Sequence, residues 1–570
     1  MPDPKMKTRP RTLDWLRDYR REWLGADSVA GVTAAAVVVP KALAFATIAG
    51  LPVQVGLATA FVPAVLYALL GGSRPMSVST TSTIAILVAA QVSQVAPEGS
   101  GVSALAVAAT LSVLVGVTLL AARVLRLGAV ANLISDPVLT GFKAGIGLVI
   151  VVDQLPKLLG IHVAKAGFLR DIVSIVRHVG ETSTPTLLVG AGLLALIFLL
   201  EHFAPKVPAP LVAVAVGIAA SSALGLAALG VSTVGTVPGG LPPFTPPLTS
   251  LVGDLWPGAV GIALMSFIET IAVGRAFREK GEPNPDPDRE LTALGAANVA
   301  GGFFGSMPSG GGTSQTAVAR RAGARTQLAG LVAGLGALAT LLFLAPLLGL
   351  MPSAALAAVV VATSVPLIKP GDFRALAKIR RTELVWAFAA TAGVVVLGTL
   401  KGILVAVLVS LVALAAQSVR PSVFPVGRKL GTDFFRRLSP DHPDDETFPG
   451  VLLVRIIGRL FFLNVGRAGD DLRALVEEAD PRVVVIDGSA LIDLEVTALK
   501  MLIEAEEASR ARGVLLCLAA LNPDVREMVE RSSLGATLGR ERMFFNLEQA
   551  VARAPALVAL AAREGGAVRA

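Results

Sequence analysis

The first 420 residues alternate long apolar runs with short polar connections. Residues 105–122 and 187–200 are two such runs, and neither contains a charged side chain. A helix that crosses a bilayer needs about 20 mostly apolar residues. One or two such runs could also be buried core helices of a soluble protein. About a dozen of them could not, so they indicate membrane spans. The pattern predicts fourteen membrane spans at roughly residues 28–48, 53–71, 79–96, 102–122, 128–152, 185–202, 208–226, 257–276, 290–305, 313–321, 326–346, 352–367, 383–399 and 402–418, with an amphipathic connector at 163–184.

The third and tenth spans begin with small and polar residues. Residues 76–83 read Met-Ser-Val-Ser-Thr-Thr-Ser-Thr, and residues 308–316 read Pro-Ser-Gly-Gly-Gly-Thr-Ser-Gln-Thr. Each lies third in a run of seven spans, and interrupted helices at matching positions of two halves point to the binding site of a transporter. Either stretch alone is equally consistent with an ordinary Ser/Gly-rich loop. The matched pair favours a site.

An extended stretch followed by a helix in both segments would make two helix N-termini face each other near the middle of the bilayer. The first turn of a helix has unpaired N–H groups and a partial positive charge, and this combination binds anions. The two segments therefore predict a small anion as the substrate. The residues expected to line the site from these segments are Ser79, Thr80, Thr81, Thr313, Ser314 and Gln315.

The composition agrees with a membrane protein, since 54% of the 570 residues are hydrophobic and 16% are charged. A soluble protein of this length needs more polar surface. The net charge of +8 gathers in loops that the span count places in the cytoplasm, which fits the positive-inside rule better than binding to nucleic acid. The cations of these loops are Arg74, Arg123, Arg126, Arg320, Arg321, Arg325, Lys369, Arg374, Lys378, Arg380, Arg381 and Arg420.

The two ends of the chain are both expected in the cytoplasm, with the spans in the plasma membrane. Residues 1–27 are polar and rich in arginine, so we expect no cleavable signal peptide. The even number of spans returns the chain to the same side. The four histidines show no ligand spacing and Cys517 cannot form an internal disulfide, so neither a metal nor another cofactor is expected. No enzyme activity is expected, because the chain has no nucleophile–base constellation and no phosphate-loop motif.

The hydrophobic pattern changes after residue 420. Residues 451–457, 483–486 and 514–519 read as strands, and residues 497–512 and 523–534 read as helices. This alternation predicts a small α/β domain. The chain thus divides into a cytoplasmic segment 1–27, a transport domain 28–420 and a C-terminal domain 421–570 with a short tail.

Ordered motifs along the chain resemble those of the sulfate permease (SulP) family, whose animal members include pendrin and prestin. The motifs are Pro40-Lys41-Ala42-Leu43-Ala44-Phe45-Ala46 with Ala49-Gly50-Leu51-Pro52, Ser73-Arg74-Pro75-Met76-Ser77-Val78, Phe267-Ile268-Glu269-Thr270 with Gly274-Arg275-Ala276-Phe277, Glu290-Leu291 through Asn298 with Gly302-Phe303-Phe304-Gly305, and Gly323-Ala324-Arg325-Thr326-Gln327-Leu328-Ala329-Gly330. The resemblance implies a seven-plus-seven inverted repeat, core and gate domains, an elevator-like movement and a C-terminal STAS domain. It also implies a homodimer in membrane lipid that moves anions by exchange or by symport with protons or sodium.

The first and tenth spans depart from the family pattern at the expected site. The family has Pro-Gln where this chain has Pro40-Lys41, and a common tyrosine is Phe45 here. The family often has Ser-Arg where this chain has Ser314-Gln315. We therefore hypothesise that Lys41 supplies the positive charge that arginine supplies in relatives, with the anion or Glu269 as its partner. An ion pair with Glu269 that only fixes packing is the alternative, because an intramembrane lysine usually has a partner or a function.

Glu269 is the residue expected to couple an ion to transport. A carboxylate beside a bound anion needs a proton or a cation to tolerate the anion's arrival, so protonation of Glu269 would link proton entry to anion entry. Thr270 and Asn298 are further polar candidates for ion coupling, although Asn298 is as well suited to bonding between helices. If Glu269 only neutralises Lys41, transport is uncoupled or is exchange.

Two other interpretations of the function, and several substrates, stay open at this point. A nucleobase transporter of the same fold and an anion channel both suit the pattern of spans, and the substrate could be sulfate, bicarbonate, chloride or a dicarboxylate.

In the C-terminal domain, Asp493 is followed by Leu494 and Glu495, where bacterial STAS antagonists have a phosphorylatable Ser or Thr. A phospho-switch is therefore not expected, and Asp493 is predicted to cap the helix that follows.

Overall fold

The computed structural model describes residues 14–17, 19–97, 99–132, 134–163, 167–205, 207–279, 282, 284–419 and 421–568. Arg420 and residues 1–13 of the arginine-rich N-terminal segment lie outside the described residues. The chain forms two compact units, residues 1–410 and 411–570.

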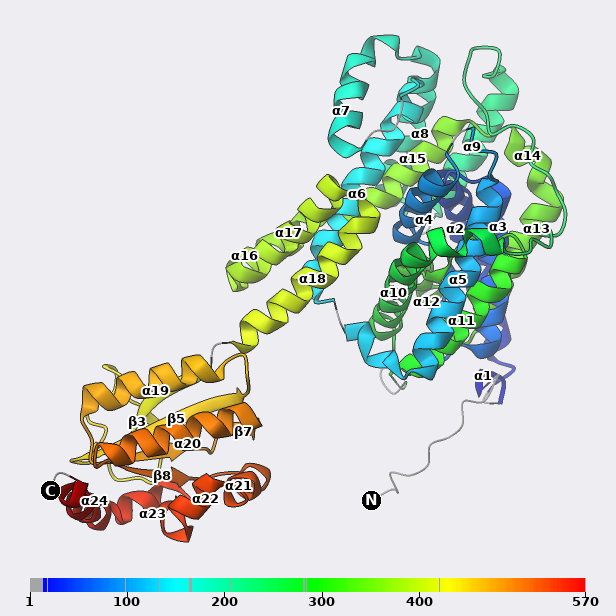
Figure 1. Cartoon of the computed structure of the whole chain (residues 1–570). Helices are drawn as coiled ribbons and strands as arrows, with labels where there is room; N and C mark the ends of the chain where they lie inside the picture. The colour runs from blue at the N-terminus through cyan, green and yellow to red at the C-terminus, as the bar shows by residue number, and fades with distance from the viewer. Residues whose placement is uncertain are drawn as a thin grey trace. The chain divides into compact units, whose positions relative to one another are not determined.

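Each predicted span overlaps a helix among the described residues, and the last of these helices, α18, continues past residue 410 into the second unit (Figure 1). Eight of the described helices are long and apolar enough to cross a membrane by length and composition alone. The helices are α1 (Asp14–Arg17), α2 (Trp23–Ile48), α3 (Val53–Leu70), α4 (Ser82–Val95), α5 (Ala104–Val124), α6 (Asp136–Leu159), α7 (Phe168–Arg177), α8 (Thr184–Phe203), α9 (Ala209–Leu224), α10 (Val252–Ala276), α11 (Pro287–Phe303), α12 (Thr313–Arg321), α13 (Leu328–Ala339), α14 (Ala345–Gly349), α15 (Ser353–Ser364), α16 (Pro370–Ile379), α17 (Arg381–Leu397) and α18 (Thr399–Ser418).

The fifth and the eleventh predicted spans differ clearly from the helices of the structure. The fifth span, predicted at 128–152, begins later, because residues 127–132 form a separate 3₁₀ turn and a proline in the first turn of α6 starts a new helix after Ser135. The eleventh span is one helix in the sequence pattern but is interrupted by a π-helical segment, Thr340–Leu344, between α13 and α14. The helix α16 was not predicted, and the connector predicted at 163–184 contains α7.

The helices of the first unit pack in two groups. In one group α2, α3, α5, α10, α11 and α13 pack on one another, with the short α4 and α12 against α10 and α2. In the other group α6, α8, α9, α15 and α17 pack together. Helix α2 contacts α9 and α15 and so lies at the boundary between the groups. These groups correspond to the core and gate that the resemblance implied.

The second unit is the predicted α/β domain. Its strands β3 (Ser422–Arg428), β4 (Phe435–Arg437), β5 (Val451–Leu460), β6 (Val483–Asp487), β8 (Leu515–Ala519) and β9 (Met543–Phe544) form one sheet in the order β4-β3-β5-β6-β8-β9, with β7 (Leu491–Leu494) paired to β5. The helices are α19 (Val465–Ala479), α20 (Val496–Ala511), α21 (Pro523–Glu530), α22 (Ser533–Leu538), α23 (Leu547–Ala552) and α24 (Ala554–Val568).

Alternate residues of the central strands divide between two cores on opposite faces of the sheet. Val484 and Leu516 pack with α19 to α22, whereas Val485 and Cys517 pack with α23 and α24, as the two-residue period of a strand requires. Such strands are buried on both faces, so they read as continuous apolar runs in the sequence.

Two predictions about this unit were wrong. The helix predicted at 523–534 is two helices, because α21 ends at Glu530 and α22 restarts at Ser533. Asp493 does not cap α20. Glu495 occupies the N-cap position, and Asp493 instead forms an ion pair with Arg459, with 2.9 Å between Nε and Oδ2.

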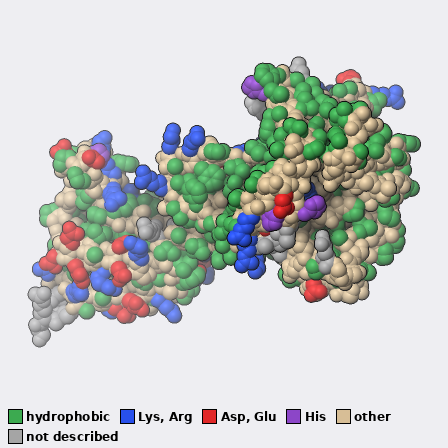
Figure 2. Space-filling view, turned by 90° about the horizontal axis from the view of Figure 1, so that it is seen from above, with side chains coloured by type: hydrophobic (Ala, Val, Ile, Leu, Met, Phe, Trp, Pro, Cys, Tyr) green, Lys and Arg blue, Asp and Glu red, His purple; other side chains and the backbone are tan. Residues whose placement is uncertain are grey.

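The surfaces of the two units differ in kind. Figure 2 shows Lys, Arg, Asp and Glu side chains gathered over the second unit, while apolar side chains predominate over the first. Apolar side chains that are more than half exposed occur on several spans, including Leu188, Phe343 and Leu404. A large exposed apolar surface marks contact with a membrane or a partner, so the first unit is the part embedded in lipid.

Cys517 should not react with thiol reagents while the protein is folded. Its side chain is fully buried in β8, and burial raises the pKa of its thiol to about 12. Only the thiolate is nucleophilic, so we expect negligible maleimide labelling at neutral pH and complete labelling after denaturation. Mass spectrometry of both samples measures this. Labelling of the folded protein at the denatured rate would contradict the prediction.

Candidate functional site

Two short extended segments meet in the middle of the first helix group. Strand β1 (Val78–Ser79) precedes α4, and strand β2 (Gly310–Gly311) precedes α12. They pair antiparallel, with Val78 opposite Gly311 and Ser79 opposite Gly310. Because the strands run in opposite directions and each leads into a helix, α4 and α12 begin on either side of one ribbon. This confirms the predicted extended-then-helical form of the third and tenth spans.

The amide of Gln315 ties the two halves of the ribbon together. Its Nε2 donates to the hydroxyl of Ser79 at 2.7 Å and to the carbonyl of Ser77 at 3.3 Å. Thr316, next along α12, accepts from the backbone N–H of Ser77 at 3.1 Å. The sequence predicted that Gln315 lines the anion site, at a position where the family often has arginine. In the structure its side-chain nitrogen donates its hydrogen bonds to Ser77 and to Ser79 of β1.

Asn298 and Thr270 hold the stretch that leads into β2. Asn298 Oδ1 accepts from the backbone N–H of Ser309 at 2.8 Å, and its Nδ2 donates to the carbonyls of Leu294 and Ser309. The Thr270 hydroxyl accepts from the N–H of Gly311 at 2.8 Å. Both side chains are fully buried. Their hydrogen bonds position the ribbon.

The two glycines of β2 and Gly312, the N-cap of α12, lie where close packing leaves little room for a side chain. A Cβ added at Gly310 would lie 2.9 Å from Ser266 Oγ, and one at Gly311 would lie 3.0 Å from the backbone Cα of Thr270. At Gly312 it would meet the side-chain amide of Gln315. The Gly-Gly-Gly sequence therefore lets the ribbon pack directly against α10.

Replacing Gly311 with alanine should impair both folding and transport. The added methyl group meets backbone that cannot move without displacing α10, and overpacking of this kind costs about 1–3 kcal/mol. We expect a lower melting temperature in detergent and slower anion uptake in proteoliposomes. Gly253→Ala is the matched control, because Gly253 lies in α10 with no atom within 4 Å of an added Cβ. Wild-type stability and uptake in Gly311→Ala would contradict the packing argument.

The N-terminus of α4 is capped by its own side chain, and this cap also contacts Glu269. The hydroxyl oxygen of Thr81 accepts from the backbone N–H of Ile84 at 3.2 Å and donates to Glu269 Oε2 at 3.0 Å. Glu269 comes from α10 and is 6% exposed. The neighbouring Thr80 is buried, and its hydroxyl has no hydrogen-bond partner among the described residues. Ser79 is also buried at this end of the helix.

The N-terminus of α12 is open. Its N-cap residue is Gly312, so no side chain caps the first turn, and no hydrogen bond to the N–H of Thr313 or Ser314 occurs in the described part of the chain. Both residues are exposed. An uncapped helix N-terminus of this kind presents free N–H donors and a partial positive charge to an anion.

Lys41 and Phe45 lie one turn apart on α2, so their side chains share a face of that helix. They are 8% and 6% exposed, and α2 packs against both α4 and α12. The acidic residue whose charge acts on Lys41 is Glu201, near the end of α8. No ion pair links Lys41 to Glu269 within the described residues. Lys41 is therefore a buried cation on a helix that packs against both helices of the ribbon.

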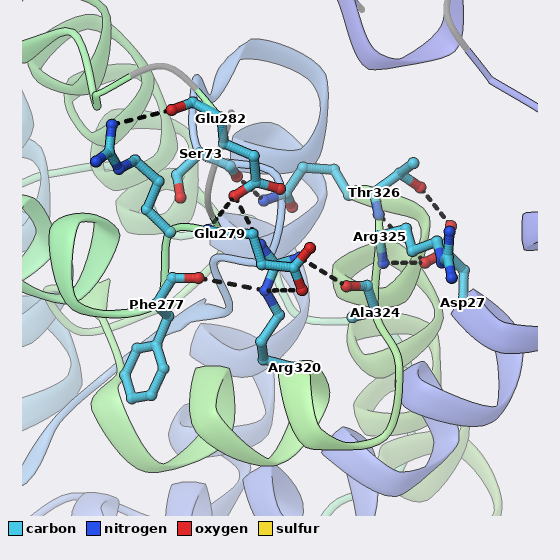
Figure 3. A network of polar contacts seen from close by, with 11 residues as sticks. Asp27, Ser73, Phe277, Glu279, Glu282, Arg320, Ala324, Arg325 and Thr326 are labelled. Atoms are coloured by element: carbon cyan, nitrogen blue, oxygen red, sulfur yellow. Dashed lines mark hydrogen bonds and ion pairs between the residues drawn. The ribbon is translucent and has the colours of Figure 1, made fainter.

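A second polar network, which the sequence did not reveal, fixes the far end of α12. Arg320 donates to Glu282 at 2.6 Å, to the carbonyl of Phe277 at 3.2 Å and to the carbonyl of Ala324 at 3.0 Å (Figure 3). These bonds connect α12 with the loop after α10. From the sequence, Arg320 was interpreted only as one of the positive charges of the cytoplasmic loops.

Two further side chains tie the start of α13 to distant segments. The buried carboxylate of Asp27, in α2, accepts from the N–H of Arg325 at 2.7 Å and from the hydroxyl of Thr326 at 2.6 Å (Figure 3). Gln327 donates to the carbonyls of Ser73 and Met76, which lead into β1. The sequence motif after the tenth span contains these polar residues. It could not reveal their partners, because Thr326 and Asp27 are 299 residues apart and Gln327 and Met76 are 251 residues apart.

Comparison with known proteins agrees with this architecture. The model of the Sulfate permease family matches residues 24–390, and that of the STAS domain matches residues 442–550. A "Probable sulfate transporter" of Mycobacterium tuberculosis (strain CDC 1551 / Oshkosh) is 35% identical over 545 residues, which cover 94% of this chain and 96% of that protein.

Two solved structures share the fold. The murine Solute Carrier 26 family member A9 anion transporter, in its inward-facing state, has a TM-score of 0.88 at 23% identity and covers 95% of this chain and 93% of that chain. The transmembrane domain of a cyanobacterium bicarbonate transporter, BicA, has a TM-score of 0.60 at 25% identity and covers 68% of this chain and 98% of that chain.

The paired broken helices, the two helix groups and the appended α/β unit define a multi-pass membrane transporter. The chain belongs to the sulfate permease family, and its second unit contains a STAS domain.

Proposed function

We propose that this protein is a secondary active transporter of small anions, and that the anion binds between the N-termini of α4 and α12. The open N-terminus of α12 carries the proposal, because the N–H groups of its first residues have no partner among the described residues and add to its partial positive charge. The buried, unpartnered hydroxyl of Thr80 lies across the ribbon and offers a further donor. A buried hydroxyl without a partner is costly, and an anion held by the N–H groups of α12 would supply that partner.

The substrate-binding set is Lys41 and Phe45 on α2, Ser79, Thr80 and Thr81 before α4, and Thr313 and Ser314 on α12. Gln315 acts by holding β1 in place. Glu269 is the coupling residue, with Thr81 as its hydrogen-bond donor. Thr270 and Asn298 serve as positioning residues for the ribbon.

The class of substrate is a small inorganic or organic anion. One relative is named a probable sulfate transporter and another a bicarbonate transporter, and both of these anions suit a site built from helix N-termini and a nearby cation. We infer an elevator-like mechanism in which the group with the ribbon moves against the group of α6, α8, α9, α15 and α17. We also propose that the protein is a homodimer in the plasma membrane. Its N-terminus and its STAS domain then lie in the cytoplasm.

An anion panel in proteoliposomes tests the function. Uptake of labelled sulfate, bicarbonate, chloride and succinate is measured with and without inward proton and sodium gradients. We expect saturable uptake of at least one anion that responds to one gradient or to an opposing anion. Labelled uracil is included because a nucleobase transporter shares the fold class, and uracil uptake without anion uptake would overturn the proposal. Currents that exceed transporter turnover would identify a channel instead.

A further inference from the structure

An apolar groove of about 370 Å³ opens between the two helix groups of the transport unit. One wall is α2, with Val39 and Leu43, and a second wall is the α13–α14 region, with Leu348. Both belong to the group that holds the ribbon. The third wall is α9 of the other group, with Leu211 and Val214. The groove therefore follows the boundary between the parts that are proposed to move.

The lining of the groove cannot hold water. Thr340 is the one lining residue with a polar side chain, and its hydroxyl already donates to the carbonyl of Gly336 at 2.9 Å. A buried water needs two to four polar partners, so the occupant must be apolar. Val39, Leu43 and Val214, which form the floor, are each less than a tenth exposed.

The rim of the groove faces the membrane. Val32, Leu344 and Leu347 line it and are 63%, 45% and 49% exposed. All three walls belong to predicted spans, so we infer that the medium around the rim is hydrocarbon. The π-helical segment Thr340–Leu344 interrupts the eleventh span at this wall, and single π turns are found frequently at functional sites.

We propose that the groove binds an acyl chain of a membrane phospholipid, which fills the boundary between the two helix groups. The occupant is fixed by chemistry, because the groove is apolar throughout its side-chain lining and opens to a medium whose apolar molecules are lipid chains. A chain in this position separates side chains of α2 from those of α9. It lets the two groups slide without exposing an empty apolar cavity, whose lining would lose its packing contacts.

The proposal is tested by photo-cross-linking of the full-length protein. The protein is reconstituted with a phosphatidylcholine that carries a diazirine in the middle of one acyl chain, and adducts are located by mass spectrometry after irradiation. We expect adducts on the floor residues Val39, Leu43 or Val214. Lipid that only surrounds the protein cannot reach these buried side chains. Adducts confined to the rim and to other outward-facing residues would overturn the proposal.

A pair of variants separates the groove from its surroundings. Ala215 lines the groove and Val216, the next residue of α9, does not, although both are exposed. We expect Ala215→Phe to fill the groove and lose the floor adducts, whereas Val216→Phe retains them. Equal floor labelling in both variants would contradict the proposal. Should Ala215→Phe fail to fold, the adducts of the unsubstituted protein still decide the question.

A second copy of the chain is the competing occupant. An Ala215→Cys variant tests it, since the native Cys517 is buried. Treatment of the reconstituted protein with a short bismaleimide should leave this variant monomeric on denaturing gels if lipid fills the groove. Rapid formation of cross-linked dimers, together with absence of floor adducts, would show that a helix of another subunit occupies it. The readouts do not depend on anion transport, so they stand apart from the proposed function.

Discussion

Replacing Glu269 with glutamine is expected to abolish anion uptake driven by a pH gradient. The carboxylate lies at the N-terminus of α4, within 3.0 Å of Thr81 Oγ1. An ionised carboxylate roughly 5 Å from a bound anion repels it by about 3 kcal/mol at an effective dielectric constant of about 20. Protonation removes this repulsion, so the proton and the anion bind together. Glutamine keeps the size and the hydrogen bond to Thr81 but cannot take up the proton.

Uptake into proteoliposomes with an acidic exterior measures this effect. We expect the pH-dependent component to vanish in Glu269→Gln, while exchange of labelled for unlabelled anion continues, because the neutral side chain still tolerates the anion. Asp254→Asn is the matched control, since Asp254 is an exposed acid on the same helix. If the gradient drives uptake by Glu269→Gln as well as by wild type, coupling through this residue is wrong, although anion transport itself would stand.

Removing the charge of Lys41 should weaken anion binding by about ten- to a hundredfold. A hydrogen bond to a charged group contributes about 1.5–3 kcal/mol, and each 1.4 kcal/mol is about a tenfold change in affinity. Lys41→Gln restores the glutamine of the family pattern, and Lys41→Ala removes the polar group altogether. We expect a raised half-saturation concentration in both variants, with the larger effect in Lys41→Ala. Wild-type affinity and rate in both would contradict a direct role in binding.

A purely structural role for Lys41 gives a different result. The alternative partner of Lys41 on α2 is Glu201 on α8, an acid of the other helix group. If that attraction is the whole function of Lys41, Glu201→Gln and Lys41→Gln should lower thermal stability equally without changing anion affinity. A double-mutant cycle on affinity and on melting temperature separates the two roles. The binding role requires that only the lysine variants change affinity.

The ribbon could be predicted from the sequence because its signal is local. Small polar residues at matching positions of the third and tenth spans cannot form ordinary apolar spans, so they indicated an extended stretch followed by a helix. The roles of Asn298 and Gln315 could not be predicted in the same way. Asn298 looked like an ion ligand or a bond between helices, but it binds the backbone of Ser309. Gln315 was predicted to line the anion site, and only the structure shows that its amide nitrogen donates to Ser79.

The sequence by itself determined that the chain spans a membrane, that two interrupted helices occupy matching positions, and that an α/β domain follows. These properties depend on periodicity, run length and local residue type, which need no knowledge of distant partners. Only the tertiary structure decided which polar groups are left free. Thr81 and Glu269 are 188 residues apart and share a hydrogen bond, whereas the backbone N–H groups of Thr313 and Ser314 have no partner among the described residues. A polar side chain that is satisfied by a distant backbone group reads in sequence like one that is free to bind a ligand.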